Sequence, residues 1–151
     1  MEQDGCHVYR IDPHTMKVTR VAHDFDHPNG LAFSTDEKHL FIADSGGTEG
    51  PTRPKHIRRF DVDVSGETLG RSTVFAECPA GFFDGFRIDQ QNRLWTSCAE
   101  GVICYRKDGQ LIGKIKIPEM VANLTFGGVQ RNRLFICGTT SLYAVYLKVN
   151  G

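Results

Sequence analysis

Short apolar runs rich in Val, Ile, Phe, Tyr and Leu recur along the whole chain, and Gly, Asp, Asn or Pro separates them. This alternation of apolar run and turn residue is typical of β-strands. No stretch of about a dozen residues has the apolar spacing of three and four that marks an amphipathic helix. The pattern therefore predicts an all-β protein. The thirteen predicted strands are His7 to Ile11, Val18 to His23, Gly30 to Ser34, His39 to Ala43, Ile57 to Val62, Ser72 to Ala76, Gly85 to Asp89, Arg93 to Ser97, Val102 to Arg106, Leu111 to Ile117, Leu124 to Phe126, Arg133 to Cys137 and Leu142 to Tyr146.

Three segments repeat a common order of residues. Each has Asn or Asp, an apolar strand, a polar turn, and then a polar residue, Leu and an aromatic residue. The shared polar residues are Asn29, Asp84 and Asn123, which are 55 and 39 residues apart. Periods of this size, with about four strands each, are typical of β-propeller blades. The longer first period contains GGTEGPTRPKH, a Gly- and Pro-rich insertion that is expected to be an exposed loop.

The number of predicted strands is too small for a closed propeller. Two strands precede Asn29, four extend from there to Pro79, four lie between Asp84 and Pro118, and three follow Asn123. Closed propellers have about four to eight blades. We therefore expect residues 1–151 to form one incomplete propeller of about three blades, with four antiparallel strands per blade and no second domain. An open arc of this kind exposes strand edges and an apolar blade face.

Composition narrows the function classes. The chain has 18 Lys plus Arg and 18 Asp plus Glu, so its formal net charge is zero, which argues against a nucleic-acid partner. No apolar run reaches the length needed to span a bilayer, so no membrane partner is expected. The five cysteines are odd in number and form no CxxC pair, which argues against a disulfide framework or a zinc ribbon. With no secretory signal visible, a cytoplasmic location is expected.

The three repeated polar residues are the candidates for chemistry. In a propeller the innermost strand of each blade starts beside the central channel, so Asn29, Asp84 and Asn123 are expected to face a ligand-sized space. A structural alternative stays open for the first two. Asn-Gly and Asp-Gly pairs also form turns, because these residues tolerate positive φ. Asn123 is expected to be structural or to face substrate.

Other motifs are less informative. His23 and His27 are four residues apart, but in a β context that spacing does not place the two side chains on one face of a helix, and a solvated loop is the better interpretation. The segment around Ser45 reads ADSGG, which is neither a GxSxG nucleophile motif nor a phosphate-binding loop.

The motifs PNGLAFS, DGFRID and NLTFGG together resemble the gluconolactonase and regucalcin (senescence marker protein) family. The resemblance covers roughly residues 5 to 147 and is to the C-terminal half of a family member. It implies a six-bladed β-propeller with one divalent metal on its central axis. It also implies hydrolysis of lactones or related carboxylic esters.

Carried onto this sequence, the resemblance makes Asn29 and Asp84 metal ligands and Asp84 also the general base. The glutamate ligand of the family's N-terminal half and a further active-site Asn have no counterpart here. We expect Phe83 to wall the substrate pocket and Asn123 to contact substrate. The cofactor is expected to be one divalent cation, calcium first, with magnesium, zinc and manganese as alternatives. Two oxygen ligands are few, because calcium takes six to eight.

Two functions follow. The first is a metal-dependent lactone hydrolase, present as a fragment that lacks the N-terminal metal-ligand blade and acts on a small-molecule lactone. The alternative is a catalytically inactive half-propeller that self-associates, or that acts as a scaffold or calcium-binding protein. In either case a homodimer or a missing N-terminal half would complete the ring.

Overall fold

A computed structural model describes residues 3–65 and 67–151. The regular elements in these residues are thirteen strands and one short 3-10 helix, η1 (Gly46–Glu49), so the predicted all-β class is confirmed. The strands are β1 (Cys6–Ile11), β2 (Val18–Phe25), β3 (Pro28–Phe33), β4 (His39–Asp44), β5 (His56–Val62), β6 (Leu69–Glu77), β7 (Phe86–Ile88), β8 (Leu94–Cys98), β9 (Gly101–Tyr105), β10 (Leu111–Lys116), β11 (Val121–Gly127), β12 (Arg133–Gly138) and β13 (Leu142–Tyr146).

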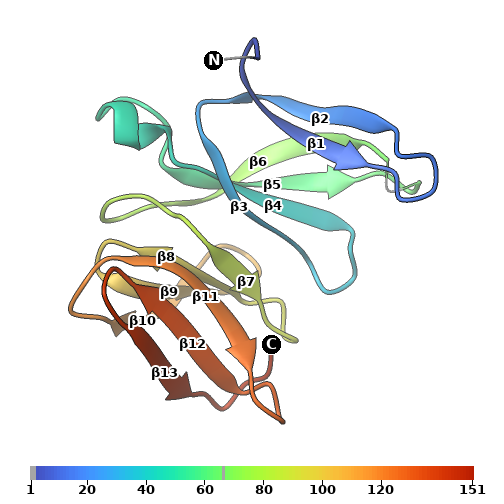
Figure 1. Cartoon of the computed structure of the whole chain (residues 1–151). Coiled ribbons are helices and arrows are strands. Elements are labelled where there is room, and N and C mark those ends of the chain that lie inside the picture. The colour runs from blue at the N-terminus through green and yellow to red at the C-terminus, as the bar shows by residue number, and fades with distance from the viewer. Residues whose placement is uncertain (1–2, 66) are drawn as a thin grey trace.

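Strands that follow one another along the chain pair in antiparallel sheets. The described residues form four sheets, with the orders β1-β2, β3-β4-β5-β6, β7-β8-β9-β10 and β11-β12-β13. Figure 1 shows the first two sheets above the last two, with β3 and β7 near the boundary between them. Contacts between sheets join β1 with β3, β3 with β7, and β11 with β7 and β8. Successive sheets are therefore neighbours in space.

Three equivalent turns support the repeat that the sequence predicts. In the β3–β4, β7–β8 and β11–β12 connections, one non-glycine residue has a left-handed φ: 57° at Glu37, 57° at Asn92 and 51° at Arg131. The backbone N–H of each donates to a carbonyl three residues earlier, as in a β-turn. A left-handed residue is uncommon outside glycine, so its recurrence at one position marks three copies of one hairpin.

The apolar core lies between the sheets. In β8, Leu94 and Cys98 face the cluster shared with the β3–β6 sheet, whereas Trp95 faces the cluster shared with β11–β13. In β9, Ile103 faces the first of these clusters and Val102 faces the second. Every residue of β8 and β9 is buried, because side chains on both faces of these strands are covered. The Trp95 and Phe126 rings meet edge to face at 6.2 Å across the second of these clusters.

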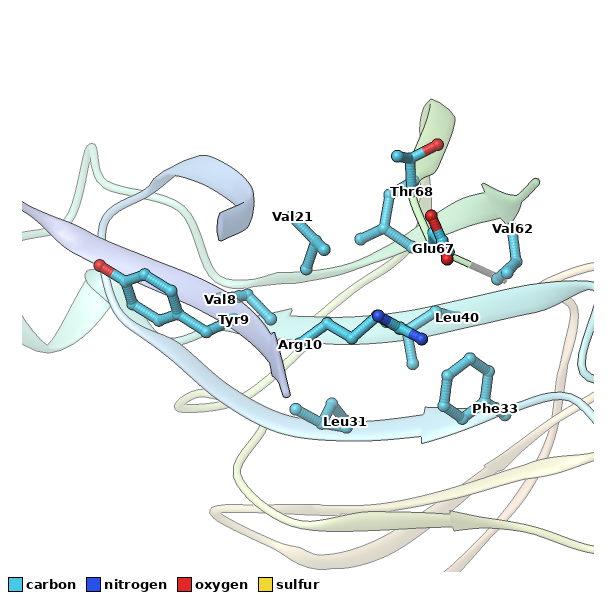
Figure 2. Close-up of a pocket in the computed structure, with 11 residues that line it drawn as sticks. Val8, Tyr9, Arg10, Val21, Leu31, Phe33, Leu40, Val62, Glu67 and Thr68 are labelled. Atoms are coloured by element: carbon cyan, nitrogen blue, oxygen red, sulfur yellow. The ribbon is translucent and has the colours of Figure 1, made fainter. Parts of the chain in front are cut away.

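The face of β3 that points away from the β7–β10 sheet is only partly covered. Leu31 is 50% exposed and Phe33 is 48% exposed. They line an apolar groove of about 170 Å³ with Val8 of β1 and Leu40 of β4. Figure 2 shows Leu31 and Phe33 on one strand beneath Val8 and Arg10. The groove lies where a sheet of two strands stands beside one of four.

The insertion between β4 and β5 is an exposed loop over much of its length, as predicted, but it begins with the ordered turn η1. Gly47 N donates to Pro54 O at 2.7 Å, which closes the loop on itself. No helix in the described residues is long and apolar enough to cross a membrane.

Candidate functional site

The three polar residues singled out by the repeat come together at one end of the inner strands β3, β7 and β11. Asn29 lies within β3, Asp84 lies two residues before β7, and Asn123 lies within β11. Gly30 N donates to Asp84 O at 3.2 Å, and Gly85 N donates to Ala122 O at 2.8 Å. Each inner strand is thus joined to the next by a backbone hydrogen bond beside its polar residue.

The glycines after Asn29 and Asp84 permit close approach and do not form turns. A Cβ at Gly30 would lie 2.2 Å from Asp84 O, and a Cβ at Gly85 would lie 2.2 Å from Asn123 Oδ1. Asn29, Asp84 and both glycines are absent from the positive-φ residues of the described chain. The interpretation of Asn-Gly and Asp-Gly as positive-φ turns is therefore wrong here. These glycines are needed because neighbouring backbones nearly touch.

Ser45, which follows β4, connects Asn29 with the segment before β7. Its hydroxyl donates to Phe83 O at 2.7 Å and accepts a hydrogen bond from Asn29 Nδ2 at 3.2 Å. A serine hydroxyl has only one hydrogen. Because that hydrogen is used on Phe83 O, the atom of Asn29 that faces Ser45 must be the amide nitrogen. The carbonyl oxygen of Asn29 is consequently the atom left free for a cation or substrate.

Ser97, in β8, makes a similar connection one sheet further along. Its hydroxyl accepts from Asp84 N at 3.2 Å and donates to Ala122 O at 3.3 Å. Both serines therefore donate to the carbonyl that precedes a candidate residue, Asp84 in one case and Asn123 in the other. Ser45 is 4% exposed and Ser97 is fully buried, so neither hydroxyl is a free surface group.

Asp44, the last residue of β4, holds the connection that leads to Asn29. Its carboxylate is 1% exposed and accepts from the backbone N–H groups of Asp26, His27 and Gly46 at 2.9–3.0 Å. A buried carboxylate needs such partners to offset its lost hydration. Asp44 thereby fixes both the start of β3 and the turn that carries Ser45.

The carboxyl group of Asp84 is partly withdrawn from water. Burial raises its pKa above the usual value of 3.8, and a hydrogen bond with the Asn29 side chain opposes that shift. Desolvation disfavours the charged form of a carboxylate, so a nearby positive charge would stabilise it. The Asn29 amide carbonyl and the Asp84 carboxylate are oxygen ligands, which suit hard cations such as calcium or magnesium.

Asn29 and Asp84 are few ligands for a metal ion. The described residues contain no group of three or more His, Cys, Asp and Glu side chains that could hold a metal. The buried thiols are poor additional ligands, because a metal binds the thiolate form. Burial raises the pKa of Cys78 to about 11 and that of Cys104 to about 12. Asn29 and Asp84 fit a divalent cation by ligand type, but they supply fewer oxygens than calcium usually takes.

The other two predicted site residues have different surroundings. Phe83 is fully buried, and its ring meets Tyr105 edge to face at 6.1 Å in the core between the middle sheets. Within this chain it is a packing residue, and its contact with substrate stays a prediction. Asn123 is exposed, and its Oδ1 accepts from Leu124 N at 2.8 Å. Its substrate-binding role also stays a prediction.

Sequence reasoning did not identify Ser45, Ser97 or Asp44 as functional. The available signal was a polar residue at the end of an otherwise apolar second strand, in IADS and in LWTS. Such residues are buried by the neighbouring sheet, and buried polar groups are almost always hydrogen-bonded to something specific.

Antiparallel sheets stacked in chain order, with a polar cluster at the ends of their inner strands, define an all-β protein of the propeller type. The model of the SMP-30/gluconolactonase/LRE-like region matches residues 1–140, and the chain belongs to this family.

Individual relatives agree with this assignment. A gluconolactonase from Zymomonas mobilis is 27% identical over 153 residues, which covers 95% of this chain and 41% of that protein. The structure of a gluconolactonase from Xanthomonas campestris is 35% identical with a TM-score of 0.84, and the match covers 96% of this chain and 46% of that one. A calcium-binding regucalcin from Agrobacterium tumefaciens shares the fold at 22% identity, with a TM-score of 0.78 and coverage of 96% and 53%. The chain spans about half the length of these relatives or less.

Proposed function

We propose that this chain is part of a metal-dependent lactone hydrolase in which Asn29 and Asp84 bind one divalent cation and Asp84 is the general base. The observation that carries the proposal is the side-by-side placement of the Asn29 amide and a desolvated Asp84 carboxylate at the ends of adjoining inner strands. Lactone hydrolases within the same family support the choice of reaction.

When bound, the cation supplies a positive charge that polarises the lactone carbonyl and lowers the pKa of bound water. Asp84 accepts a proton from the attacking water, as a general base placed beside the cation does. Ser45 keeps the Asn29 carbonyl directed away from Phe83 O. Asn123, on the next inner strand, contacts the substrate.

Calcium is the proposed ion, with magnesium, zinc and manganese as alternatives. The regucalcin structure that shares this fold is described as calcium-binding, and the ligand atoms of Asn29 and Asp84 are both oxygens. Zinc prefers nitrogen and sulfur ligands, so it is the least suited of the four.

We further propose that residues 1–151 are a partial six-bladed propeller. The described residues form sheets of two, four, four and three strands, and the matched region is 41% of the Zymomonas mobilis protein and 46% of the Xanthomonas campestris protein. An N-terminal half would supply the remaining blades and the remaining metal ligand. In its absence a second copy of the chain is the alternative way to close the ring.

The second candidate function is self-association without catalysis. The exposed apolar residues Leu31 and Phe33 on β3, together with Leu142 and Tyr146 on β13, favour it. Size-exclusion chromatography with light scattering tests it directly, because a stable monomer at high concentration contradicts self-association.

The hydrolase is tested with purified chain, calcium and a panel of lactones, measured alone and after addition of an N-terminal half taken from a relative. Asp84→Asn and Asn29→Ala are expected to abolish calcium binding measured by calorimetry and any hydrolysis. Asp108→Asn, in the β9–β10 turn, is the matched control for loss of one carboxylate and is expected to leave both unchanged. Full activity in Asp84→Asn contradicts the proposal.

A further inference from the structure

Asp84 borders a small recess in the surface of the chain. The recess has a volume of about 100 Å³, and its other lining residues are Gly81, Phe82, Ala99, Met120 and Val121. They come from three segments: the approach to β7, the β8–β9 turn, and the start of β11. Asp84 is the only lining residue with a charged or polar side chain.

The walls of the recess are held by the fold. Ala99 N donates to Ala80 O at 3.2 Å, which ties the β8–β9 turn to the segment before Asp84. Gly81 has a φ of 72°, and a Cβ there would lie 2.8 Å from the Ala99 Cβ. Val121, the first residue of β11, is 2% exposed and lines the recess from that strand. The recess therefore has a defined position next to the candidate base.

Met120 is a half-exposed part of this lining, with an exposed fraction of 58%. Packing in the core does not explain a methionine at this position, because the nearby buried cluster includes Val121 and Leu124 but not Met120. Methionine is common at binding surfaces because its unbranched side chain adapts to the shape of an apolar partner. Half-buried Phe82 provides an aromatic wall of the same recess.

We infer that this recess binds a hydrocarbon substituent of the lactone, so that the substrate class is alkyl- or aryl-substituted lactones rather than polyhydroxylated sugar lactones. The inference rests on the proposed function, because it places the ester at Asp84 and the substituent beside it. A sugar lactone would bring several hydroxyl groups against a wall with no partners for them, and unpaired buried hydroxyls are costly.

The size of the recess sets the expected substituent. An apolar cavity of about 150 Å³ is large enough to hold benzene. A recess of about 100 Å³ that opens to solvent is accordingly suited to a short alkyl chain or to one edge of an aromatic ring. Each buried methylene is expected to strengthen binding by up to about fourfold until the recess is filled.

The test uses the Met120 methyl group as a probe that does not depend on turnover. The chain, labelled with ¹³C at methionine methyls, is titrated with 5-alkyl-pyrrolidin-2-ones, which are cyclic amides that resist hydrolysis, with alkyl chains of increasing length. Met16, in the β1–β2 turn and 69% exposed, is the internal control for nonspecific binding. The Met120 signal is expected to shift with an affinity that rises with alkyl length, while the Met16 signal stays unchanged.

Two variants of Ala99 sharpen the result. Ala99→Leu fills the recess and is expected to weaken binding of the longest amide at least tenfold, whereas Ala99→Ser keeps the size of the side chain and is expected to change binding less. Calcium binding measured on the same samples distinguishes failure of the proposed hydrolase from failure of the inference about the recess. Amide binding at Met120 without calcium binding contradicts the proposed hydrolase but supports the recess. An affinity that does not depend on alkyl length, or a Met120 signal that responds to gluconolactone and not to the alkyl amides, overturns the inference.

Discussion

Asn29 donates a hydrogen bond from its side-chain amide to the Ser45 hydroxyl at 3.2 Å, and that hydroxyl is already committed to Phe83 O at 2.7 Å. The order of donor and acceptor along this chain of atoms determines which end of the Asn29 amide faces outward. Asparagine oxygen and nitrogen have nearly the same shape, so only hydrogen bonding distinguishes the two orientations. Ser45 is therefore a positioning residue for the proposed cation ligand.

Removing the Ser45 hydroxyl is expected to weaken calcium binding by about tenfold or more, the usual cost of losing a group that orients a metal ligand. Ser34→Ala is the matched control, because Ser34 is also buried and its hydroxyl bonds Asp36 near the far end of β3. In an Asn29→Asp background both terminal atoms are oxygens, so Ser45→Ala should have little further effect. Calorimetry measures calcium binding by wild type, Ser45→Ala, Ser34→Ala, Asn29→Asp and the Asn29→Asp/Ser45→Ala double variant. Equal calcium affinities in wild type and Ser45→Ala would contradict the orienting role.

Gly85→Ala is expected to destabilise the fold by about 1–3 kcal/mol, as overpacking does in a dense interior. The added methyl would lie 2.2 Å from Asn123 Oδ1 and 3.0 Å from Asn123 Cα, so the β11 backbone would have to move. Gly113→Ala, in β10, is the control because nothing lies within 4 Å of its Cβ position. Urea unfolding monitored by Trp95 fluorescence compares the two, and equal midpoints would show that the close approach at Gly85 is not needed.

Arg58 fastens the β1–β2 sheet to β5, and the attachment should depend on pH. Its guanidinium lies 4.8 Å from the Phe25 ring centre and 4.7 Å from that of Phe60, and it bonds Asp24 Oδ2 at 2.8 Å. The hydrogen bond with Arg58 holds the pKa of Asp24 below its usual value of 3.8. The pair therefore stabilises the fold above about pH 4, and this contribution is lost as pH falls through the lowered pKa.

Asp24→Asn is accordingly expected to reduce the free energy of unfolding at pH 7 by less than about 1 kcal/mol, because the carboxylate is largely exposed. The difference from wild type should disappear in acid, once Asp24 is protonated in both the folded and the unfolded chain. Unfolding curves at pH 7 and pH 3 measure it. A difference that persists unchanged at pH 3 would assign the effect to packing rather than charge.

The cysteines should differ sharply in reactivity. Cys137 is exposed, whereas Cys78, Cys98 and Cys104 are buried with pKa values that burial raises. The thiolate is the reacting form, so burial suppresses alkylation both by lowering the thiolate fraction and by blocking access of the reagent. Iodoacetamide at pH 8 is expected to modify Cys137 well before these three, as read by mass spectrometry of peptides. Early modification of Cys104 would show that β9 opens readily.

Much of the fold could be predicted because two-residue periodicity and turn chemistry act locally. The repeated pattern of a polar residue, Leu and an aromatic residue predicts equivalent strand starts, and these starts are those of β4, β8 and β12: His39-Leu40-Phe41, Arg93-Leu94-Trp95 and Arg133-Leu134-Phe135. Strand ends were less predictable. β11 begins at Val121, well before the expected Leu124, because pairing with Gly138 of β12 extends the strand past the apolar run.

The site was predictable only as a set of repeated positions. Asn29, Asp84 and Asn123 stood out because the repeat placed them in register. The serines that connect them did not, because a hydrogen bond between Ser45 and Phe83 spans 38 residues and leaves no local pattern. The packing partner of Phe83 left no pattern in the sequence either, since Tyr105 belongs to β9 and meets Phe83 only when the sheets pack.

The stacking of sheets in chain order also determines how the molecule opens. The sheets named above contact their neighbours along the chain, as in a linear array, so each interior sheet is held on two sides and each terminal sheet on one. In this chain by itself, local unfolding is therefore expected to start at the terminal sheets, with amide hydrogens exchanging fastest in β1–β2 and β11–β13 and slowest in β8 and β9. Because Asn29 lies in one interior sheet and Asp84 lies two residues before the first strand of the other, their relative positions are expected to persist until the last part of the chain opens.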